Sequence, residues 1–492
     1  MKAPLLILLL AGSLAGAAEA GPLQLKAAVH VHSTFSTGDK SLEELAQEAR
    51  RKGIDALILT DNLLLRFEYG LFPLRGLVRK VVEKPSVLQA GLEAYLGAVD
   101  AVQARFPDVV LVPGVEVVPY YYWTGSLFTH DLTMWGAQRN LLVVGLPRVE
   151  DYRRIPAIGN GRRAIGGAGA FLRLGLAVTA MAGGFVLLTK QRIRTIRLTY
   201  VRLTVQKRYR LPGWTSMGVG VLLLGDALMS PEASRLNPYE GDLGIRPYQD
   251  VIDAAEARGG MTFWSLTEAR DFNEIAVGPL GTVTVRTEPH PEVLLESGGY
   301  TGFGAMYPDT VTVTEPGQQW DRLLGDYAEG RRARPAWGIG EVAYHGSPKP
   351  LDEVVTMVWA RERSRQAILA ALRAGQVYPL TPRPDYHLRL DEFSISQEGM
   401  RTWVPMGAEL RATGPRPLLV SLRLSATDGR AVPVAVRLIR TGRVASELQM
   451  TTPVDTVLTL EPPAAGAREF VRIEVTKPHP LLSNPIFVRR PE

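Results

Sequence analysis

Two long apolar stretches inside this 492-residue chain constrain its fold more than any other feature. Residues 165–189 carry one charge, Arg173, and are long enough to cross a membrane as a helix, which takes about 20 apolar residues. Residues 212–230 form a weaker second candidate, because Asp226 near their end is costly in lipid. We therefore predict a transmembrane helical hairpin over residues 164–230. The alternative is a pair of buried helices in a soluble domain.

The connection between these stretches, residues 190–210, holds eight basic residues and no acidic one. Subtracting these eight charges from the formal net charge of +6 leaves −2 for the rest of the chain, so the basicity is local and we expect no nucleic-acid partner. Short basic loops stay in the cytoplasm, which places both flanking regions outside. Because Ile193, Ile196, Tyr200 and Leu203 fall near helical spacing, a variant of this prediction lays the loop on the inner leaflet.

The N-terminus independently predicts export. Lys2, the apolar residues 5–14 and Ala18-Glu19-Ala20 follow the order of a signal peptide over residues 1–20, either cleaved or kept as an anchor. The alternative is a buried N-terminal helix. With the hairpin, this predicts an inner-membrane protein whose folded parts lie on the periplasmic side, in contact with membrane lipid. The chain has no cysteine, which excludes disulfides, thiolate metal sites and a cysteine nucleophile.

Strand and helix signals alternate on both sides of the hairpin. The predicted strands are short apolar runs at residues 25–30, 56–60, 109–112, 261–264 and 337–342. The predicted helices lie at residues 41–53, 92–106, 248–258 and 364–374. Ser41 and Glu44 have the spacing of a capping box at the first helix. This rhythm implies parallel strands with crossover helices, so the hairpin is an insertion in one α/β domain formed by residues 21–163 and 231–379.

The pattern changes near Thr381. Later strands alternate apolar and polar residues and are separated by turn signals such as Asp428-Gly429. Their predicted positions are residues 418–424, 432–439, 457–460 and 470–475. Residues 380–492 are therefore predicted to form a small β-sandwich.

A pair of histidines follows the first predicted strand. In an extended chain, residues two apart point to the same side, so His30 and His32 can converge on one ion. Asp61 and Glu116 each follow another apolar run. Because the carboxyl ends of the strands form the active-site face of (β/α) barrels, these side chains can meet in one cleft. For Asp61 alone, the alternative is a satisfied buried polar group.

Several separated motifs resemble those of the PHP (polymerase and histidinol phosphatase) superfamily, in the same order. They are His30-x-His32-Ser33-x-x-Ser36-x-Gly38, Leu57-x-x-Thr60-Asp61, Pro113-Gly114-Val115-Glu116, and GIGEVAYHG at residues 338–346. The resemblance covers most of residues 24–378 apart from the hairpin, and residues 483–488 resemble exported members with a trailing β domain. It implies a PHP-type distorted (β/α)7 barrel with an inserted transmembrane hairpin, followed by the β-sandwich.

The resemblance also implies roles for six residues. As metal ligands they are His30, His32, Asp61, Glu116, His130 and His345. Glu116 would bridge two ions, the first completed by His30 and His32 and the second by His130. His345, with Asp61, would assist the leaving group or bind a weaker third ion. Imidazole and carboxylate ligands suit Zn, Mn or Fe.

The chain departs from the family pattern at three ligand positions, where it has Asn62, Leu266 and Ala343. Glu341 is a candidate replacement for the last of them. We therefore expect one or two ions rather than three. The predicted function is metal-dependent hydrolysis of a small phosphorylated envelope substrate. The alternative is a catalytically degenerate barrel that acts as a membrane-anchored binding or scaffold protein, whereas the basic loop is too small for a sensor's output domain.

Overall fold

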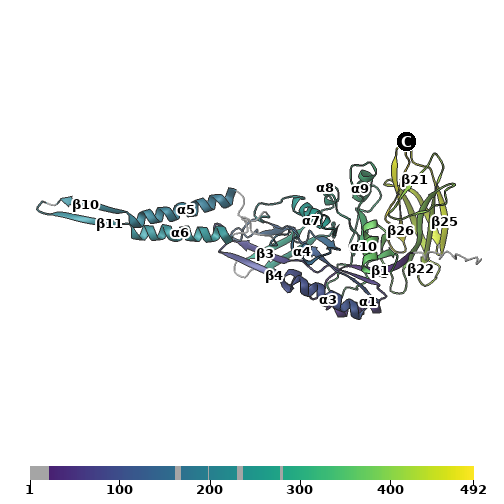
Figure 1. Cartoon of the computed structure of the whole chain (residues 1–492), viewed down its shortest axis with the longest axis horizontal. Coiled ribbons are helices and arrows are strands. Elements are labelled where there is room, and N and C mark those ends of the chain that lie inside the picture. The colour runs from purple at the N-terminus through teal and green to yellow at the C-terminus, as the bar shows by residue number, and fades with distance from the viewer. Residues whose placement is uncertain (1–21, 161–167, 198, 230–235, 277–280) are drawn as a thin grey trace, which may run out of the picture.

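The computed structural model describes residues 22–160, 168–197, 199–229, 236–276 and 281–492. Three parts follow one another along its long axis (Figure 1): a helical hairpin, an α/β body, and a β-rich C-terminal part on the side of the body opposite to the hairpin. The predicted signal peptide, residues 1–20, lies outside the described residues.

The helices of the body begin and end at the residues that the sequence marks for this purpose. At the start of α1 (Leu42–Arg51), the predicted capping box is present: Ser41 Oγ accepts from the Glu44 amide, and the Glu44 carboxylate accepts from the Ser41 amide. At the end of α10 (Arg365–Ala374), Gly375 takes up the left-handed conformation that stops the helix.

In the described residues, two sheets build the body. One has the order β17 (Val355–Ala360), β1 (Leu23–Val31), β2 (Ala56–Leu59) and β5 (Val110–Val112). The other has the order β16 (Trp337–Gly340), β15 (Gly302–Met306), β12 (Met261–Trp264), β9 (Leu141–Val144) and β6 (Gly114–Val117). β1, β2 and β5 are mutually parallel, as the strand–helix rhythm predicts, and α1 and α3 (Leu92–Arg105) connect them.

The two sheets are joined at both sides by backbone hydrogen bonds next to the predicted site residues. On one side, the Tyr344 amide donates to His30 O at 2.8 Å and Tyr344 O accepts from the His32 amide at 2.9 Å. On the other, the Leu63 amide donates to Glu116 O at 2.8 Å. A path of neighbouring strands therefore runs from β1 through β2, β6, β9, β12, β15 and β16 and returns to β1.

β9 departs from the parallel pattern, because it pairs antiparallel with both β6 and β12. The chain between β6 and β9 is fully described and contains β7 (Tyr122–Thr124) and β8 (Thr133–Trp135) instead of a helix. A parallel connection needs a crossover helix, whereas an antiparallel return does not.

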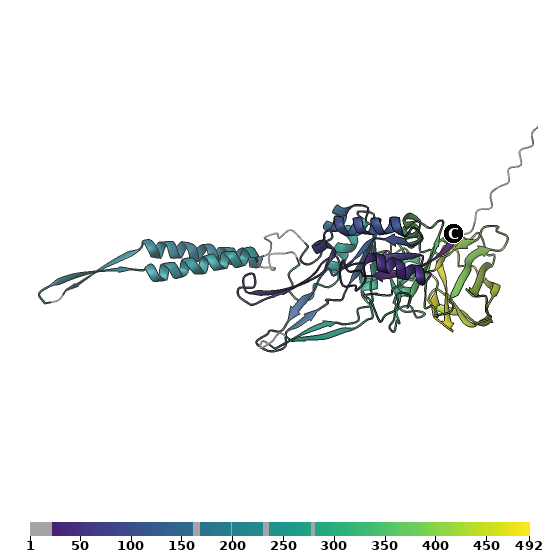
Figure 2. The same ribbon diagram turned by 90° about the horizontal axis from the view of Figure 1, so that it is seen from below.

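Strand hairpins that the sequence analysis did not predict extend from the ends of the body strands. β3 (Leu65–Gly70) and β4 (Arg79–Lys84) follow β2, β7 and β8 follow β6, and β13 (Asp271–Ala276) and β14 (Thr282–Thr287) follow β12. Figure 2 shows these hairpins reaching from the body toward the side on which the helical hairpin projects. They start where the strands end at the candidate site, so they surround that face.

The C-terminal part contains two sheets that face each other around their own apolar core, which includes Phe393, Leu422 and Ile473. One sheet is formed by β20 (Val404–Pro405), β19 (Leu388–Gln397), β22 (Leu418–Ala426) and β25 (Val454–Leu460). The other is formed by β21 (Glu409–Arg411), β28 (Ile486–Arg489), β26 (Arg468–Lys477), β23 (Pro433–Arg440) and β24 (Arg443–Thr451). Through β27 (Leu481–Leu482) and β18 (Val377–Leu380), the second sheet continues into the body.

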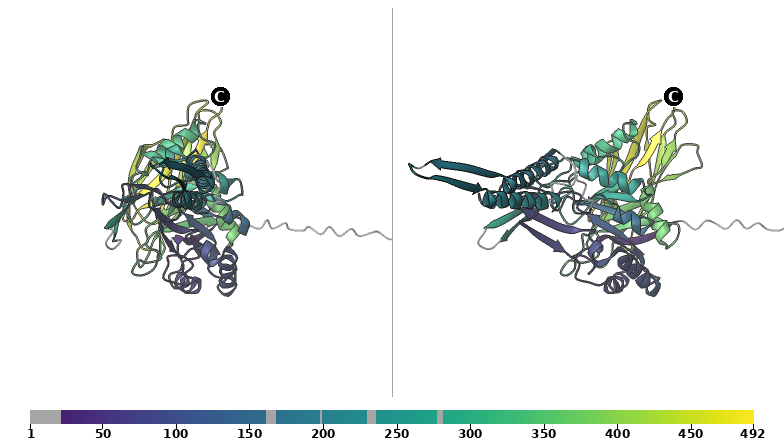
Figure 3. Two further views of the ribbon diagram at one scale, coloured as in Figure 1. Left: turned by 90° about the vertical axis from the view of Figure 1, so that its left-hand side faces the viewer. Right: turned by 60° about the vertical axis from the view of Figure 1, so that its left-hand side comes forward.

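The helical hairpin consists of α5 (Ala168–Thr189) and α6 (Arg210–Met229), which lie side by side away from the body (Figure 3). Both helices are long and apolar enough to cross a membrane, and most of their apolar side chains are exposed. Core helices of a soluble domain bury such side chains, so the soluble alternative does not account for this exposure.

The basic connection forms a two-stranded ribbon, β10 (Gln191–Arg197) and β11 (Arg202–Arg208). The prediction of helical spacing in this loop is therefore wrong. Ile193 and Ile196 are three residues apart in a strand, so their side chains point to opposite faces. The period-two alternation of Arg192, Ile193 and Arg194 was the signal for a strand.

The two charges that interrupt the apolar helices pair with each other. Arg173 Nη1 on α5 lies 3.4 Å from Asp226 Oδ2 on α6, near the end of the helical hairpin that adjoins the body. Asp226 is buried and also accepts a hydrogen bond of 2.6 Å from the Gly76 amide. The residue that weakened the second span in the sequence is thus neutralised within the structure.

Arg472 on β26 connects the C-terminal part to the body. Its guanidinium donates to both carboxylate oxygens of Asp321 on α9 (Gln319–Ala328), at 2.8 and 2.9 Å, and to Thr314 O at 2.8 Å. Both members of the ion pair are buried. Such a bidentate pair fixes the orientation of the two parts.

Replacing Arg472 by Met should destabilise the protein, because the substitution leaves the Asp321 carboxylate buried without a counter-charge. We expect the free energy of unfolding of the detergent-solubilised chain to fall by about 3–5 kcal/mol. Urea denaturation followed by tryptophan fluorescence measures this. The double variant R472M/D321L should recover most of the loss, and an R472M midpoint equal to that of the wild type would contradict the role of the pair.

Candidate metal centre

The first histidine of the site lies in a strained piece of strand. His30 has a φ of 69°, which is uncommon for a residue other than glycine, and the pairing of β1 with β2 shifts register between Val29 and Val31. The expectation that His30 and His32 share a side as alternating residues of an extended strand therefore needs correction. A bulge re-aims the His30 side chain, and this is what brings both imidazoles to Glu116.

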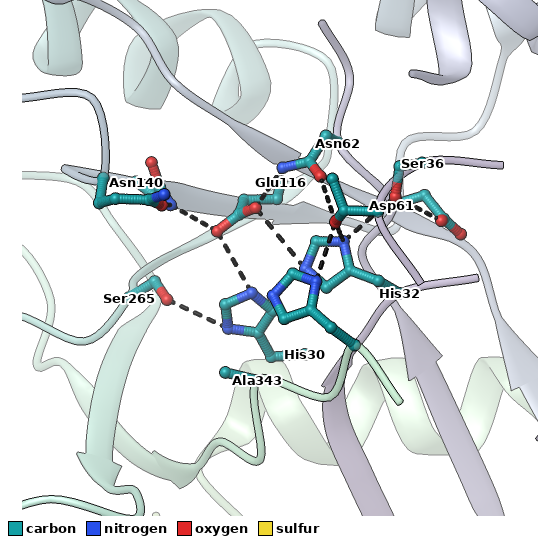
Figure 4. A network of polar contacts seen from close by, with 12 residues as sticks. His30, His32, Ser36, Asp61, Asn62, Glu116, Asn140, Ser265 and Ala343 are labelled. Carbon is teal, nitrogen blue, oxygen red and sulfur yellow. Dashed lines mark hydrogen bonds and ion pairs between the residues drawn. The ribbon is translucent and has the colours of Figure 1, made fainter. Parts of the chain in front are cut away.

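His30, His32 and Glu116 form a buried cluster (Figure 4) whose candidate ligand atoms lie within 4.8 Å of one another. His30 Nε2 is 3.2 Å from Glu116 Oε1, and His32 Nε2 is 3.6 Å from Glu116 Oε2. Neither Nε2 atom has a hydrogen-bond partner among the described residues. Two buried imidazole nitrogens therefore face one carboxylate at ion-pair distance, without a well-formed hydrogen bond.

The environment of His32 fixes which ring nitrogen carries the proton. Ser36 Oγ donates its hydrogen to Asp61 Oδ1 at 2.7 Å and lies 3.2 Å from His32 Nδ1. Since the hydroxyl has already donated its only hydrogen, it accepts from Nδ1–H. The lone pair of His32 is then on Nε2, on the side of Glu116. Hydrogen bonding at the far nitrogen is the usual way in which proteins orient a metal-binding histidine.

His30 is oriented in the same way by a carboxylate. Glu341 Oε2 lies 2.9 Å from His30 Nδ1 and accepts a second hydrogen bond of 2.7 Å from Ser265 Oγ. Nδ1 therefore donates, so that in the neutral ring the Nε2 lone pair faces Glu116. Gly304 makes room for this arrangement, because a Cβ at that position would lie 1.8 Å from Glu341 Oε1. Glu341, suggested by the sequence as a replacement ligand, thus supports His30 from behind.

The electrostatics of the cluster call for positive charge. Burial opposes the charged imidazole, but the carboxylates of Glu116 and Glu341 outweigh it and raise the pKa of His30 to about 9. Burial also opposes the charged form of Glu116, but the neighbouring histidines outweigh it and lower the pKa of Glu116 to about 2. Buried carboxylates are stable only when they are paired or coordinate a metal. When His30 is deprotonated, a cation between Glu116 and the two Nε2 atoms supplies the positive charge that the imidazolium proton otherwise supplies.

Glu116 has further partners that limit how many ions it can hold. Asn140 Nδ2 donates to Glu116 Oε1 at 2.6 Å, and Asn62 Nδ2 donates to Glu116 Oε2. In the resemblance, Asn62 stands where the family has a histidine. Each oxygen of Glu116 thus has an amide donor on the side away from the imidazoles, where a second ion would need an oxygen lone pair. The residues present fit one ion held by His30, His32 and Glu116, a His₂Glu set that leaves a position open.

His345 lies at the mouth of the cluster. Its ring stacks on His32, with centroids 4.1 Å apart and an angle of 14° between planes, and it is exposed to solvent. Thr37 Oγ1 donates to Asn62 Oδ1 at 3.0 Å and lies 2.9 Å from His345 Nδ1. Because Thr37 has one hydrogen, it accepts from Nδ1–H, which leaves Nε2 of His345 as a proton acceptor.

The structure does not bring two of the sequence-predicted ligands to this cluster. Asp61 is buried, but its carboxylate accepts from the Ser33 amide, Ser33 Oγ and Ser36 Oγ at 2.7 to 2.9 Å, so it organises the loop after β1. His130 is exposed in the turn between β7 and β8, beside Gly281 at the start of β14. Its expected role at a second ion has no support in this placement.

At two positions, the family that the motifs resemble has a metal ligand and this chain has a side chain that cannot bind a metal. Leu266 and Ala343 stand where the family has a histidine and an aspartate, and their φ values are 46° and 45°. Such conformations are costly for residues with a Cβ and persist where the surrounding structure imposes them. The surrounding structure therefore holds both strand ends in a strained conformation.

The site also uses residues that the sequence analysis did not identify. Asn140 precedes β9, Ser265 follows β12, and Thr37 lies in the loop after β1. Their positions at strand ends are the only sequence signal for them. Which polar group each one contacts depends on the curvature of the sheets, which no local pattern encodes.

No protein-family model matches this chain, and no curated protein matches it. Among solved structures, it is similar to a two-domain protein from Bacteroides vulgatus that contains a predicted PHP-like metal-dependent phosphoesterase, with 12% identity, 93% of this chain and 91% of that chain covered, and a TM-score of 0.34. A protein from Bifidobacterium adolescentis described as a metal-dependent phosphoesterase follows, with 15% identity, coverages of 67% and 91%, and a TM-score of 0.29.

An amidohydrolase from Chromobacterium violaceum is also similar, with 13% identity, coverages of 65% and 88%, and a TM-score of 0.28. The first of these neighbours is named PHP-like, after the family that the sequence motifs resemble. At these TM-scores the likeness is remote, so the chemistry is argued from the residues of this chain.

Removing the carboxylate behind His30 should weaken metal binding. In Glu341→Ala, we expect the affinity for Zn²⁺ to fall about 10- to 100-fold, because the imidazole loses the acceptor that fixes its tautomer. His32→Ala, which removes a ligand, should lower it further. Competition with a chromogenic chelator measures these affinities. His130→Ala should bind like the wild type, and a loss there would instead support the role that the family resemblance gives to His130.

Proposed function

We propose that this chain is a member of the PHP superfamily, that the path of strands around the site is a distorted (β/α)7 barrel, and that the protein is a metal-dependent hydrolase of phosphoesters. The observation that carries the proposal is the pair of buried Nε2 atoms that face the carboxylate of Glu116 without a well-formed hydrogen bond. A histidine pair whose far nitrogens are both hydrogen-bonded, facing one carboxylate, is the arrangement in which proteins hold a metal ion.

A divalent ion held by His30, His32 and Glu116 supplies a Lewis acid and a water molecule of lowered pKa. The residues of the chain do the remaining work. Asn62 and Asn140 hold the Glu116 carboxylate in one orientation. Ser36, Ser265 and Glu341 hold the two imidazoles. The ligands are thus fixed before substrate binds, which is the condition for electrostatic stabilisation without reorganisation.

His345 is placed to move a proton. Its exposed ring lies directly over His32, and Thr37 holds the Nδ1 hydrogen so that Nε2 is available. An imidazole beside the reacting groups can take up a proton at Nε2 and, as the imidazolium, protonate the leaving oxygen of an ester. We therefore assign His345 as the general acid of the proposed reaction.

A second function is favoured by a specific observation. Leu266 and Ala343 cannot bind a metal, and two amides already donate to Glu116. A barrel with these changes can serve as a membrane-anchored binding or scaffold protein without turnover. Metal content separates the two proposals: one ion per chain supports the hydrolase, and none supports the scaffold.

Hydrolysis of 4-nitrophenyl phosphate and methyl 4-nitrophenyl phosphate by the full chain, with Zn²⁺ or Mn²⁺, tests the proposed activity. Glu116→Ala should abolish it, and His345→Ala should lower kcat by about 10²–10⁴-fold, the usual contribution of a general acid, when phenyl phosphate is the substrate, and by less with the 4-nitrophenyl esters, whose leaving group departs without a proton. His387→Ala, a histidine remote from the site at the start of β19, is the matched control. Activity of Glu116→Ala at the wild-type level would remove the proposed centre.

We further propose that α5 and α6 span the inner membrane, that β10 and β11 lie in the cytoplasm, and that the body and the C-terminal part lie in the periplasm. The eight basic residues of the connecting segment, the exposed apolar helices and the signal-peptide pattern support this orientation. The phosphorylated substrate is then one of the cell envelope.

The lack of cysteine makes this topology directly testable. In bacterial spheroplasts, Val457→Cys on exposed β25 should react with a membrane-impermeant maleimide, because it lies in the periplasmic part. Thr195→Cys in the ribbon should react only after the membrane is permeabilised. Labelling of Thr195→Cys in intact spheroplasts would refute the orientation.

A further inference from the structure

The β3–β4 hairpin connects the metal centre to the membrane helices. At its base, the Val87 amide donates to Asn62 O at 2.9 Å, and the Leu63 amide donates to Glu116 O at 2.8 Å. The segment that contains β3 and β4 is therefore hydrogen-bonded at both of its ends to Asn62 or Glu116. Strands of six residues reach about 20 Å from this base, at the usual rise for a strand.

At the other end, the hairpin rests on α6. The Gly76 amide donates to Asp226 at 2.6 Å, Arg79 Nη1 donates to Met229 O at 3.3 Å, and the Leu77 side chain lies over Gly225. Figures 1 and 2 show the hairpin reaching the end of α6 that adjoins the body. The turn of the hairpin is thus held at the level where α5 and α6 leave the body.

The turn between the strands is apolar and only partly covered. Residues 71–78 read LFPLRGLV, and Phe72 is 71% exposed while Val78 is 47% exposed. A soluble surface rarely presents an apolar turn with an exposed phenylalanine at its tip. Residues 65–84 also contain five basic and two acidic residues. Apolar side chains flanked by cations are the composition of segments that lie in the headgroup region of an anionic membrane.

Resting on the proposed function, we propose that the β3–β4 hairpin is a second membrane contact, which holds the mouth of the metal centre over the bilayer, and that the substrate is a phosphoester carried on a lipid of that leaflet. The occupant of the apolar turn is lipid because the turn is continuous with helices that are themselves long and apolar enough to span. A substrate anchored in the same leaflet is presented to the site by diffusion in two dimensions.

The membrane contact is tested first and without reference to catalysis. Full-length Phe72→Cys, labelled with bimane and reconstituted in vesicles of phosphatidylethanolamine and phosphatidylglycerol, should be quenched by nitroxide-labelled lipids. Val457→Cys, exposed at the far end of the molecule, is the matched control and should not be quenched. Equal quenching of the two positions, or none at Phe72→Cys, overturns the contact.

The substrate class is tested with two esters that share one scissile bond. In hydrolysis of hexadecyl and ethyl 4-nitrophenyl phosphate, water adds to phosphorus, the P–O bond to 4-nitrophenolate breaks, and the phenolate is read by absorbance. Reconstituted wild type should hydrolyse the lipid ester at least about tenfold faster at equal total concentration, because a shared surface raises effective concentration. This ratio should fall in Phe72→Ser, in which α5 and α6 still anchor the chain but the turn no longer holds the mouth of the centre at the bilayer, and it should stay unchanged in Val457→Ser.

The failures of the two proposals are distinguishable. Equal rates with both esters in the wild type overturn the lipid-borne substrate and leave the hydrolase in place. Hydrolysis of neither ester overturns the lipid-borne diester, and the proposed function falls as well only if 4-nitrophenyl phosphate and methyl 4-nitrophenyl phosphate are also left intact; the quenching result at Phe72→Cys decides the membrane contact in either case.

Discussion

The backbone of the ligand residues holds the two sheets of the body together. His30 and His32 bond to Tyr344 on one side, and Glu116 bonds to Leu63 on the other. The same short segments place the side chains that face the centre of the site. A shift of one of these segments by one residue would break the backbone hydrogen bonds between the sheets and would also move the side chains of the cluster. The cluster and the connections between the sheets therefore depend on each other. The bulge at His30 satisfies both requirements, because it turns the His30 side chain while the backbone hydrogen bond to Tyr344 is kept.

Buried charge explains most of the remaining polar residues. Glu116 and Glu341 are both buried. Asn140 donates a hydrogen bond to Glu116, and Ser265 donates one to Glu341. In a medium of low dielectric constant, a buried hydrogen-bond network that is only partly satisfied is costly. Each amide or hydroxyl around these carboxylates must therefore be placed accurately enough to donate its hydrogen bond. The candidate ligands of the centre are thus oriented by hydrogen bonds from neighbouring residues. They are fewer than in the pattern of the family that the motifs resemble.

Sequence reasoning located the parts of the site that lie in local motifs. His30, His32 and Glu116 come from strand ends that apolar runs make visible, and the structure brings them together. The role of His130 came only from the resemblance, whereas Asp61 was also indicated by its position after an apolar run. The structure places Asp61 in a loop and His130 in an exposed turn. Asn140 and Ser265 were not found, because a lone polar residue after a strand has no pattern of its own. Hairpins such as β3–β4 were missed for a related reason, since their strands are mixed in polarity and half exposed.

The ion pair between Arg173 and Asp226 has a consequence for biogenesis. A single arginine or aspartate at depth in a helix opposes insertion by about 2.5–3.5 kcal/mol at the bilayer centre and by less near its surface. In this chain each helix carries one such residue, and each neutralises the other only when the two helices lie together. On the proposed membrane topology, release of α5 into lipid before α6 had been synthesised would place Arg173 in lipid without Asp226. The proposed topology therefore favours insertion of the two helices as a pair, with the ribbon that joins them on the cytoplasmic side.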